Sequence, residues 1–186
     1  MEQNQEPERS TSSTRINTPN WVFIILAIIA VILIIYGVSY EPGLREYDKG
    51  LKYQETNQLT LAEQQYKIAI QKNPDLAEAY LNLGVIYIEN GWYNGAERMI
   101  KECITILQRK NKTIVEGYTL DQILSIAYNN LGTICMGRAL QAEININISL
   151  ARDQWKSGME YYRKAIELDP MNSQAQANIE LYKNAY

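Results

Sequence analysis

The sequence contains no histidine and only two cysteines among its 186 residues. The lack of histidine removes the commonest general base, the usual Ser and Cys triads and most catalytic zinc sites. Cys103 and Cys135 lie far apart and form no Cys-x-x-Cys pair, so neither a zinc site nor a disulfide framework is indicated. Carboxylates such as Asp121, Glu143 and Asp153 show no pairing or metal-ligand spacing. The sequence therefore predicts a protein that is not an enzyme and that uses no cofactor or metal.

Clustered positive charge is also scarce, because 18 Lys and Arg residues stand against 21 Asp and Glu residues, for a net charge of −3. Nucleic-acid binding requires Lys and Arg gathered on one face. The nearest approach is the segment QRKNK over 108–112, which is typical of a solvated turn. No nucleic-acid partner is predicted.

Charge is absent altogether from Trp21 to Tyr40, and Val22 to Ile35 is apolar without a break. A helix of about 20 residues spans about 30 Å, the thickness of the hydrocarbon core of a bilayer. The aromatic residues at both ends of the run suit the membrane interfaces. These features predict a transmembrane helix over 20–40, with bilayer contact through 21–40, after a disordered polar tail over 1–19.

A cleaved signal peptide is the alternative reading of this run, since small residues at 37–39 could flank a cleavage site. The apolar run is long for a signal peptide, which favours an uncleaved N-terminal anchor. Two arginines precede the run and three basic residues follow it closely, so the positive-inside rule leaves the side of the membrane undetermined.

From about residue 43 the chain reads as helices that repeat with a fixed period. Three small or aromatic residues recur 34 positions later: Gly50, Tyr53 and Ala62 return as Gly84, Tyr87 and Ala96. Further on, SIAYNNLGTIC (125–135) repeats the Tyr-x-x-Leu-Gly element of AYLNLGVIY, and GMEYYRKAIELDP (158–170) repeats AEQQYKIAIQKNP (62–74).

This pattern resembles the tetratricopeptide repeat (TPR) family, a 34-residue helix–turn–helix unit. The resemblance implies an all-α solenoid of about three repeats plus a capping helix, over 43–186. The expected repeats are about 43–76, 77–110 and 125–172, with insertions near 109–124 and 138–151 and a capping helix over 173–186.

The repeat pattern also predicts local packing. Gly84 and Ala96 should be small because the two helices of a repeat cross most closely there. Cys103 and Cys135 fall on core positions of the repeat and are expected to be buried thiols.

The helix starts and the second insertion are less regular. Asp75 and Ser173 follow the prolines that end second helices, so each is expected to cap the next helix. The alternation of polar and apolar residues at 145–149 leaves a loop or a strand-like segment open as alternatives to helix.

The resemblance implies a concave groove lined by the first helices of the repeats. The residues expected there are aliphatic, tyrosine and amide side chains, which suit a peptide or a partner helix: Tyr47, Leu51, Leu81, Asn82, Val85, Ile88, Asn129, Asn130 and Thr133. TPR co-chaperones that bind the acidic C-terminus of heat-shock proteins use two Lys, two Asn and one Arg at set groove positions. Only Asn82 matches that set, so such a ligand is not expected.

Together these features predict a non-catalytic, single-pass membrane-anchored adaptor or scaffold that binds a protein partner, itself membrane-associated. Its layout is similar to that of the N-terminally anchored TPR factors of photosystem assembly in cyanobacteria and plastids. The structural alternative is a self-associating membrane protein that forms homo-oligomers. Whether the groove or the insertions carry specificity is left open.

Overall fold

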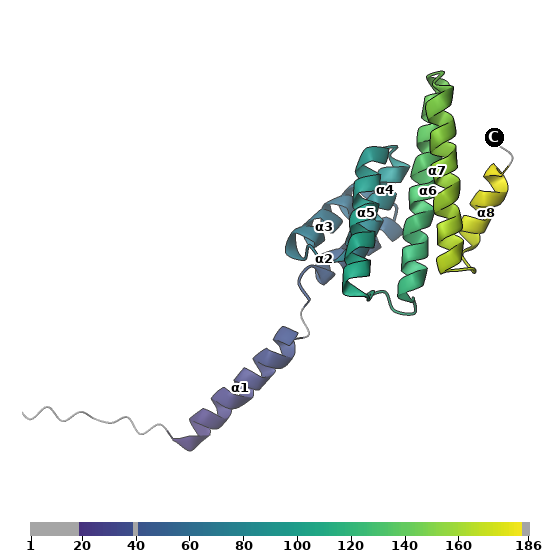
Figure 1. The fold of residues 1–186 in the computed structure, drawn as a ribbon. Coiled ribbons are helices and arrows are strands. Elements are labelled where there is room, and N and C mark those ends of the chain that lie inside the picture. Colours follow the sequence, from purple (N-terminus) through teal and green to yellow (C-terminus); the bar gives the residue numbers. More distant parts are fainter. Residues whose placement is uncertain (1–18, 39–40, 184–186) are drawn as a thin grey trace, which may run out of the picture. The chain divides into compact units, whose positions relative to one another are not determined.

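The computed structural model describes residues 19–38 and 41–183, and within these ranges all regular secondary structure is helical (Figure 1). The chain divides into two compact units, Met1–Tyr40 and Glu41–Tyr186. The prediction of an all-α fold is therefore confirmed for the described residues.

The first unit contains the helix α1 (Asn20–Val38), which carries no charged residue. Its described apolar side chains are largely exposed, as at Phe23. Among the residues that the structure describes, no helix is both long and apolar enough to cross a membrane, so the predicted transmembrane helix over 20–40 is not supported. The prediction rested on the whole uncharged run from Trp21 to Tyr40, and this run extends beyond residue 38, where the described part of the unit ends. Residues 39–40, and residues 1–18 of the tail predicted over 1–19, lie outside the described residues.

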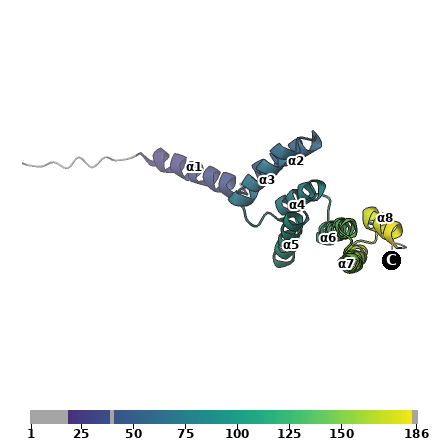
Figure 2. The same ribbon diagram turned by 90° about the horizontal axis from the view of Figure 1, so that it is seen from above.

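The second unit is a row of helices joined by short turns, apart from a longer linker over 111–119. Its helices are α2 (Leu44–Glu55), α3 (Leu59–Lys72), α4 (Ala77–Glu89), α5 (Tyr93–Lys110), α6 (Leu120–Ile144), α7 (Ile148–Leu168) and α8 (Ser173–Tyr182). Helices that follow each other in the chain pack together, and α4 also contacts α6. Seen from above, α4, α6 and α8 lie along one side of the row and α5 and α7 along the other (Figure 2).

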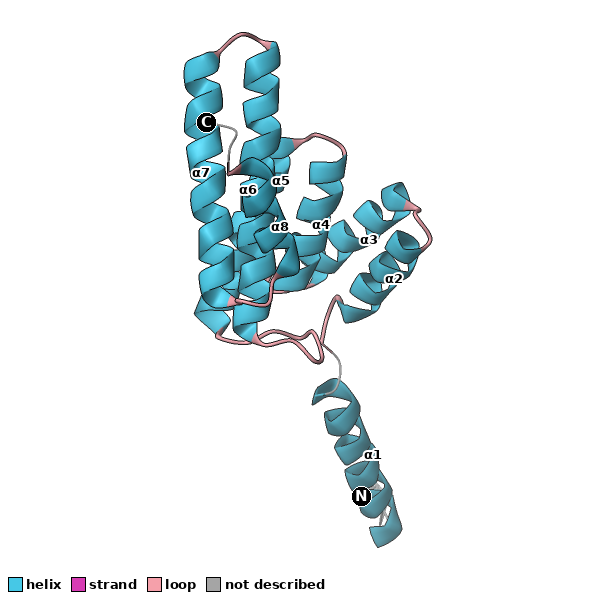
Figure 3. Ribbon diagram, turned by 90° about the vertical axis from the view of Figure 1, so that its right-hand side faces the viewer, coloured by secondary structure: helices cyan, strands magenta, loops and turns pink. Residues whose placement is uncertain are grey.

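The third helix pair is longer than the others and extends past them at one end (Figures 1 and 3). The predicted insertion near 138–151 accounts for the extra length, because α6 continues to Ile144 and α7 begins at Ile148. In the segment 145–149, for which a loop or a strand-like segment remained open, residues 145–147 form the turn between the two helices and residues 148–149 begin α7.

The small residues of the repeat pattern lie where the helices approach most closely. A Cβ atom added to Gly84 would come within 2.5 Å of Cδ1 of Ile100, and Ala96 is completely buried. The expectation that a larger side chain would hold these helices apart is confirmed. The equivalent glycine of the third pair, Gly132, faces the ring of Tyr162 in the same way.

Both cysteines lie in the core, as expected. Cys103 belongs to the cluster that joins the second and third helix pairs, and Cys135 lies on the buried face of α6. Burial raises the pKa of both thiols above the ordinary value, so the thiolate is disfavoured at neutral pH.

The start of α4 differs from the prediction that Asp75 caps it. Leu76 occupies the cap position without a side-chain bond, and the backbone N–H of Asp75 donates to Oδ1 of Asn73. The carboxylate of Asp75 instead pairs with Arg109 at the end of α5, at 2.5 Å. Asp75 therefore links the α3–α4 turn to the end of α5.

The starts of α6 and α8 are fixed by side-chain caps. Thr119 and Gln122 form a reciprocal capping box at the start of α6. At α8 the cap is Asn172, which accepts from the N–H of Ala175, so the expectation that Ser173 is the cap is wrong by one residue.

Candidate protein-binding groove

Besides Asn82, five of the residues predicted for the groove are partly accessible on first helices. They are Leu51 on α2, Val85 and Ile88 on α4, and Asn130 and Thr133 on α6. Because α4 packs against α6, the structure brings the side chains of these two helices onto neighbouring elements. The result is a surface of aliphatic and small polar side chains without a basic residue among these five.

Three other predicted groove residues are buried and belong to the core. Tyr47, Leu81 and Asn129 are only 8%, 6% and 4% exposed. Tyr47 packs against Tyr66, with ring centroids 5.9 Å apart. These three side chains are therefore not offered to a partner.

The remaining predicted residue, Asn82, is held between the first two helix pairs. Its Nδ2 lies 3.4 Å from the hydroxyl oxygens of both Tyr47 and Tyr66, and the Tyr66 hydroxyl donates to Gln54 at 2.7 Å. Burial raises the pKa of Tyr47 to about 12, so its hydroxyl stays protonated. The network fixes the orientation of this amide.

The two asparagines of α6 differ in their surroundings. Asn129 accepts a hydrogen bond of 3.0 Å from Asn178, so α8 covers this position of the last helix pair. The Nδ2 atom of the next residue, Asn130, is buried and has no hydrogen-bond partner among the described residues. A buried donor without an acceptor is costly.

One polar contact near the groove was missed by sequence reasoning. Glu78 on α4 is buried, and its Oε1 accepts from Thr113 at 2.6 Å and from the N–H of Ile114 at 2.8 Å. The linker between α5 and α6 is thereby attached to the start of α4. Thr113 and Ile114 lie 35 and 36 positions after Glu78 in the chain, and no local sequence motif predicts the contact.

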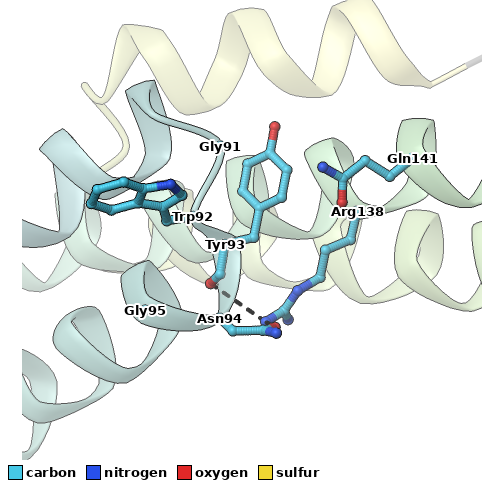
Figure 4. A pocket seen from close by; sticks show the side chains of 7 residues that line it. All are labelled: Gly91, Trp92, Tyr93, Asn94, Gly95, Arg138 and Gln141. Atoms are coloured by element: carbon cyan, nitrogen blue, oxygen red, sulfur yellow. Dashed lines mark hydrogen bonds between the residues drawn. The ribbon is translucent and has the colours of Figure 1, made fainter.

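A cavity of about 220 Å³ lies where the α4–α5 turn meets α6 (Figure 4). Its lining is mainly glycine, aromatic and amide groups: Gly91, Trp92, Tyr93, Asn94, Gly95, Arg138 and Gln141. Arg138 donates to Asn94 at 2.7 Å and also pairs with Glu97 at 2.6 Å, which neutralises its charge. Within the described ranges, no group of three or more His, Cys, Asp or Glu residues is placed to hold a metal ion. The cavity offers no convergent pair of ionisable groups for acid–base chemistry.

The helical hairpins, the close contacts at glycine and the row of first helices define a helical repeat protein. Two family models match the chain: a TPR repeat model over residues 46–91 and a tetratricopeptide repeat model over residues 77–106. The helices beyond 106 lie outside both matches. The search of curated proteins found no match.

Two solved structures share the fold. The N-terminal domain of stress-induced protein-1 (STI-1) from C. elegans aligns with a TM-score of 0.55 and 11% identity, over 76% of this chain and 94% of that one. The first TPR of Spaghetti (RPAP3), bound to HSP90 peptide SRMEEVD, aligns with a TM-score of 0.58 and 15% identity, over 77% and 91%. The family models and the shared fold support the TPR family and an all-α TPR solenoid for this chain.

Proposed function

We propose that this chain is a non-catalytic adaptor whose groove, on α2, α4 and α6, binds a peptide or helix of a protein partner. TPR proteins generally mediate protein–protein interactions, and one of the two similar structures is a TPR bound to a peptide. The observation that carries the proposal is the accessible aliphatic and amide surface of the first helices, centred on Val85 and Ile88 of α4.

The chemistry of this surface selects the kind of partner. Val85, Ile88 and Leu51 favour aliphatic side chains of the partner, and the partly accessible amide of Asn130 favours a backbone group. The HSP90 peptide bound by the RPAP3 domain is rich in carboxylates. Tyr47 and Leu51 stand here where the acidic-peptide binders of the family carry Lys and Asn, so we propose an apolar segment as the ligand and not an acidic C-terminus.

The test is co-purification of partners with the intact chain and with two charge variants. Val85→Glu puts a carboxylate into the proposed groove, whereas Gln71→Glu puts the same group on the exposed face of the second helix α3. Loss of a defined set of partners with V85E and their retention with Q71E is the expected result. Equal retention by both variants, with the helical content of each unchanged, would refute groove binding.

We further propose that α1 and the residues beside it hold this adaptor at a membrane. The support is the uncharged run from Trp21 to Tyr40 and the exposure of the α1 side chains. Anchoring would raise the effective concentration of the groove for membrane-bound partners. Assembly of a membrane protein complex, such as a photosystem, is one role that this arrangement would serve.

Membrane attachment is tested by extraction with alkaline carbonate. The unmodified chain should stay in the membrane pellet, and the double variant Ile25→Lys and Ile29→Lys should be released, because lysine is costly in hydrocarbon. Release of the unmodified chain would contradict the anchor, without bearing on the groove.

A further inference from the structure

We propose that the free end of the α6–α7 hairpin inserts into the interfacial layer of an anionic lipid bilayer. This end, the hairpin tip, comprises residues 144–150. The tip shares no residue with the proposed groove or with α1, so the inference does not depend on either proposed role. Figures 1 and 3 show the two helices reaching past α4 and α5 to this end.

The tip exposes an unusual amount of aliphatic surface. Ile144 and Ile146 are 80% and 83% exposed, and Ile148 and Leu150 are about half exposed. No charged residue occurs from Ile144 to Ala151. Solvated helix turns normally carry polar residues, so a contiguous aliphatic end marks an interaction surface.

The backbone conformation of the tip also supports an interaction surface. Ile146 adopts a φ of +58°, in the left-handed region that β-branched residues avoid. At the other described positions with positive φ the residue is glycine or asparagine, which tolerate this conformation: Gly43, Asn57, Gly91, Asn111 and Gly117. The turn thus keeps an exposed isoleucine at its apex at a conformational cost that glycine or asparagine would avoid.

Close packing and a hydrogen bond hold α6 and α7 together near the tip. Ala142 of α6 and Ala151 of α7 are buried in one cluster with Trp155, and small residues allow the two helices to approach closely. The indole N–H of Trp155 donates to Glu143 at 3.1 Å, which bonds the two helices near the tip. The tip is therefore a rigid projection.

Three charged residues follow the tip along α7, namely the cations Arg152 and Lys156 with the carboxylate of Asp153 between them. Arg152 and Lys156 lie four and eight residues after Ile148, which corresponds to about 6 and 12 Å along the helix. With the isoleucines about 5–10 Å deep at the acyl boundary, these two side chains reach the level of the phosphates. The distances match an end-on insertion of the hairpin.

The same two cations line a cleft between α7 and α8 with a volume of about 250 Å³. Its lining combines basic and apolar groups without an acidic residue: Arg152, Trp155, Lys156, Met159, Arg163, Tyr182 and Lys183. In the part of the chain that the structure describes, neither Arg152 nor Lys156 forms an ion pair with a carboxylate. This charge is complementary to anionic headgroups.

The side-chain chemistry favours lipid over a protein partner. Protein interfaces concentrate their binding energy in Trp, Tyr and Arg residues held in pockets. The tip offers only isoleucine, leucine, serine and asparagine on a protruding end, a composition that suits penetration into hydrocarbon.

The experiment places an environment-sensitive NBD fluorophore on the full-length chain at Ile146→Cys. The native cysteines are buried with raised thiol pKa values, so the new thiol is labelled selectively. The matched control is Met171→Cys, because Met171 is 84% exposed and lies in the α7–α8 turn at the opposite end of α7. Vesicles contain equal parts of phosphatidylcholine and phosphatidylserine, with or without nitroxide-labelled acyl chains.

The expected result is a blue shift and nitroxide quenching of the probe at position 146 and neither at position 171. The response at 146 should weaken in vesicles of phosphatidylcholine alone, and also with Arg152→Gln plus Lys156→Gln. Because each probe reports its own position, attachment through α1 cannot produce this difference. Equal responses at the two positions, or no response at 146, would overturn the proposal. A blue shift at 146 that needs membrane proteins and is absent with pure lipid would overturn it in favour of a protein partner.

Discussion

The close approach of α6 and α7 at Gly132 predicts that the substitution Gly132→Ala destabilises the protein. An added Cβ would lie 2.5 Å from Cδ1 and 2.9 Å from Cζ of the Tyr162 ring, well inside van der Waals contact. The ring has little room to move, because Tyr162 is only 1% exposed and stacks on Tyr182 at a centroid distance of 6.4 Å. The helices must therefore separate or the ring must leave its preferred position.

Two opposing terms set the size of the effect. Overpacking of this kind costs about 1–3 kcal/mol, and alanine recovers about 1 kcal/mol over glycine inside a helix. The net loss of unfolding free energy should be about 1 kcal/mol, and it can be measured by guanidinium titration followed by circular dichroism. A G132A variant as stable as the unmodified chain would refute the close contact.

Two controls separate packing from helix propensity. At Gly95 an added Cβ would lie 3.0 Å from the partly exposed Tyr87 ring, which has room to shift. Gly95→Ala should therefore leave the stability unchanged or raise it by up to about 1 kcal/mol. The clash at Gly132 involves ring carbons, so adding Tyr162→Phe should not rescue G132A.

Three further predictions concern the groove, the hairpin tip and the buried phenols. The peptide SRMEEVD should bind the chain no better than a scrambled peptide in calorimetry, because the groove lacks the cations that pair with carboxylates. Binding of SRMEEVD that is lost when the salt concentration is raised would contradict this. Ile146→Gly should raise the unfolding free energy by about 0.5–1 kcal/mol in denaturant titrations, because relief of left-handed strain exceeds the added chain entropy; a less stable variant would refute the strain. Burial raises the pKa of Tyr47 and Tyr162 to about 12 in the folded state. The contribution of the two protonated phenols to the free energy of unfolding is therefore complete below pH 10, and it should be lost as pH rises from 10 to 12. The free energy of unfolding of Tyr162→Phe should decline less steeply over this range. Identical pH profiles of the variant and the unmodified chain would contradict this.

The helix pairs could be predicted because their signals are local. Apolar residues at helical spacing mark each helix, and the 34-residue recurrence of Gly50 as Gly84 marks the crossing of each pair. The extension of the third pair could not be predicted in this way. The alternation at 145–149 has the period of a strand, whereas the burial of Ala142 and Ala151 in one cluster requires two helices.

The sequence could predict which helices line the candidate groove, but it could not predict which of their residues are available to a partner. Asn129 and Asn130 are adjacent in the sequence, yet only Asn129 bonds to Asn178 on α8. Buried Ser125 likewise donates to the carbonyl of Ala165, 40 residues away, with nothing local to indicate it. Such assignments depend on which helix packs where, a property of the assembled fold.

Photo-crosslinking in cells that express the full chain tests the central claim most directly. A photoreactive amino acid at Val85 would lie on the proposed groove, and the same probe at Gln71 would lie on the exposed face of α3. The account predicts a discrete crosslink to another protein from position 85 and none from 71, with the crosslinked peptide identified by mass spectrometry as an apolar segment. Crosslinks from both positions, or none from 85 in a folded chain, would contradict it.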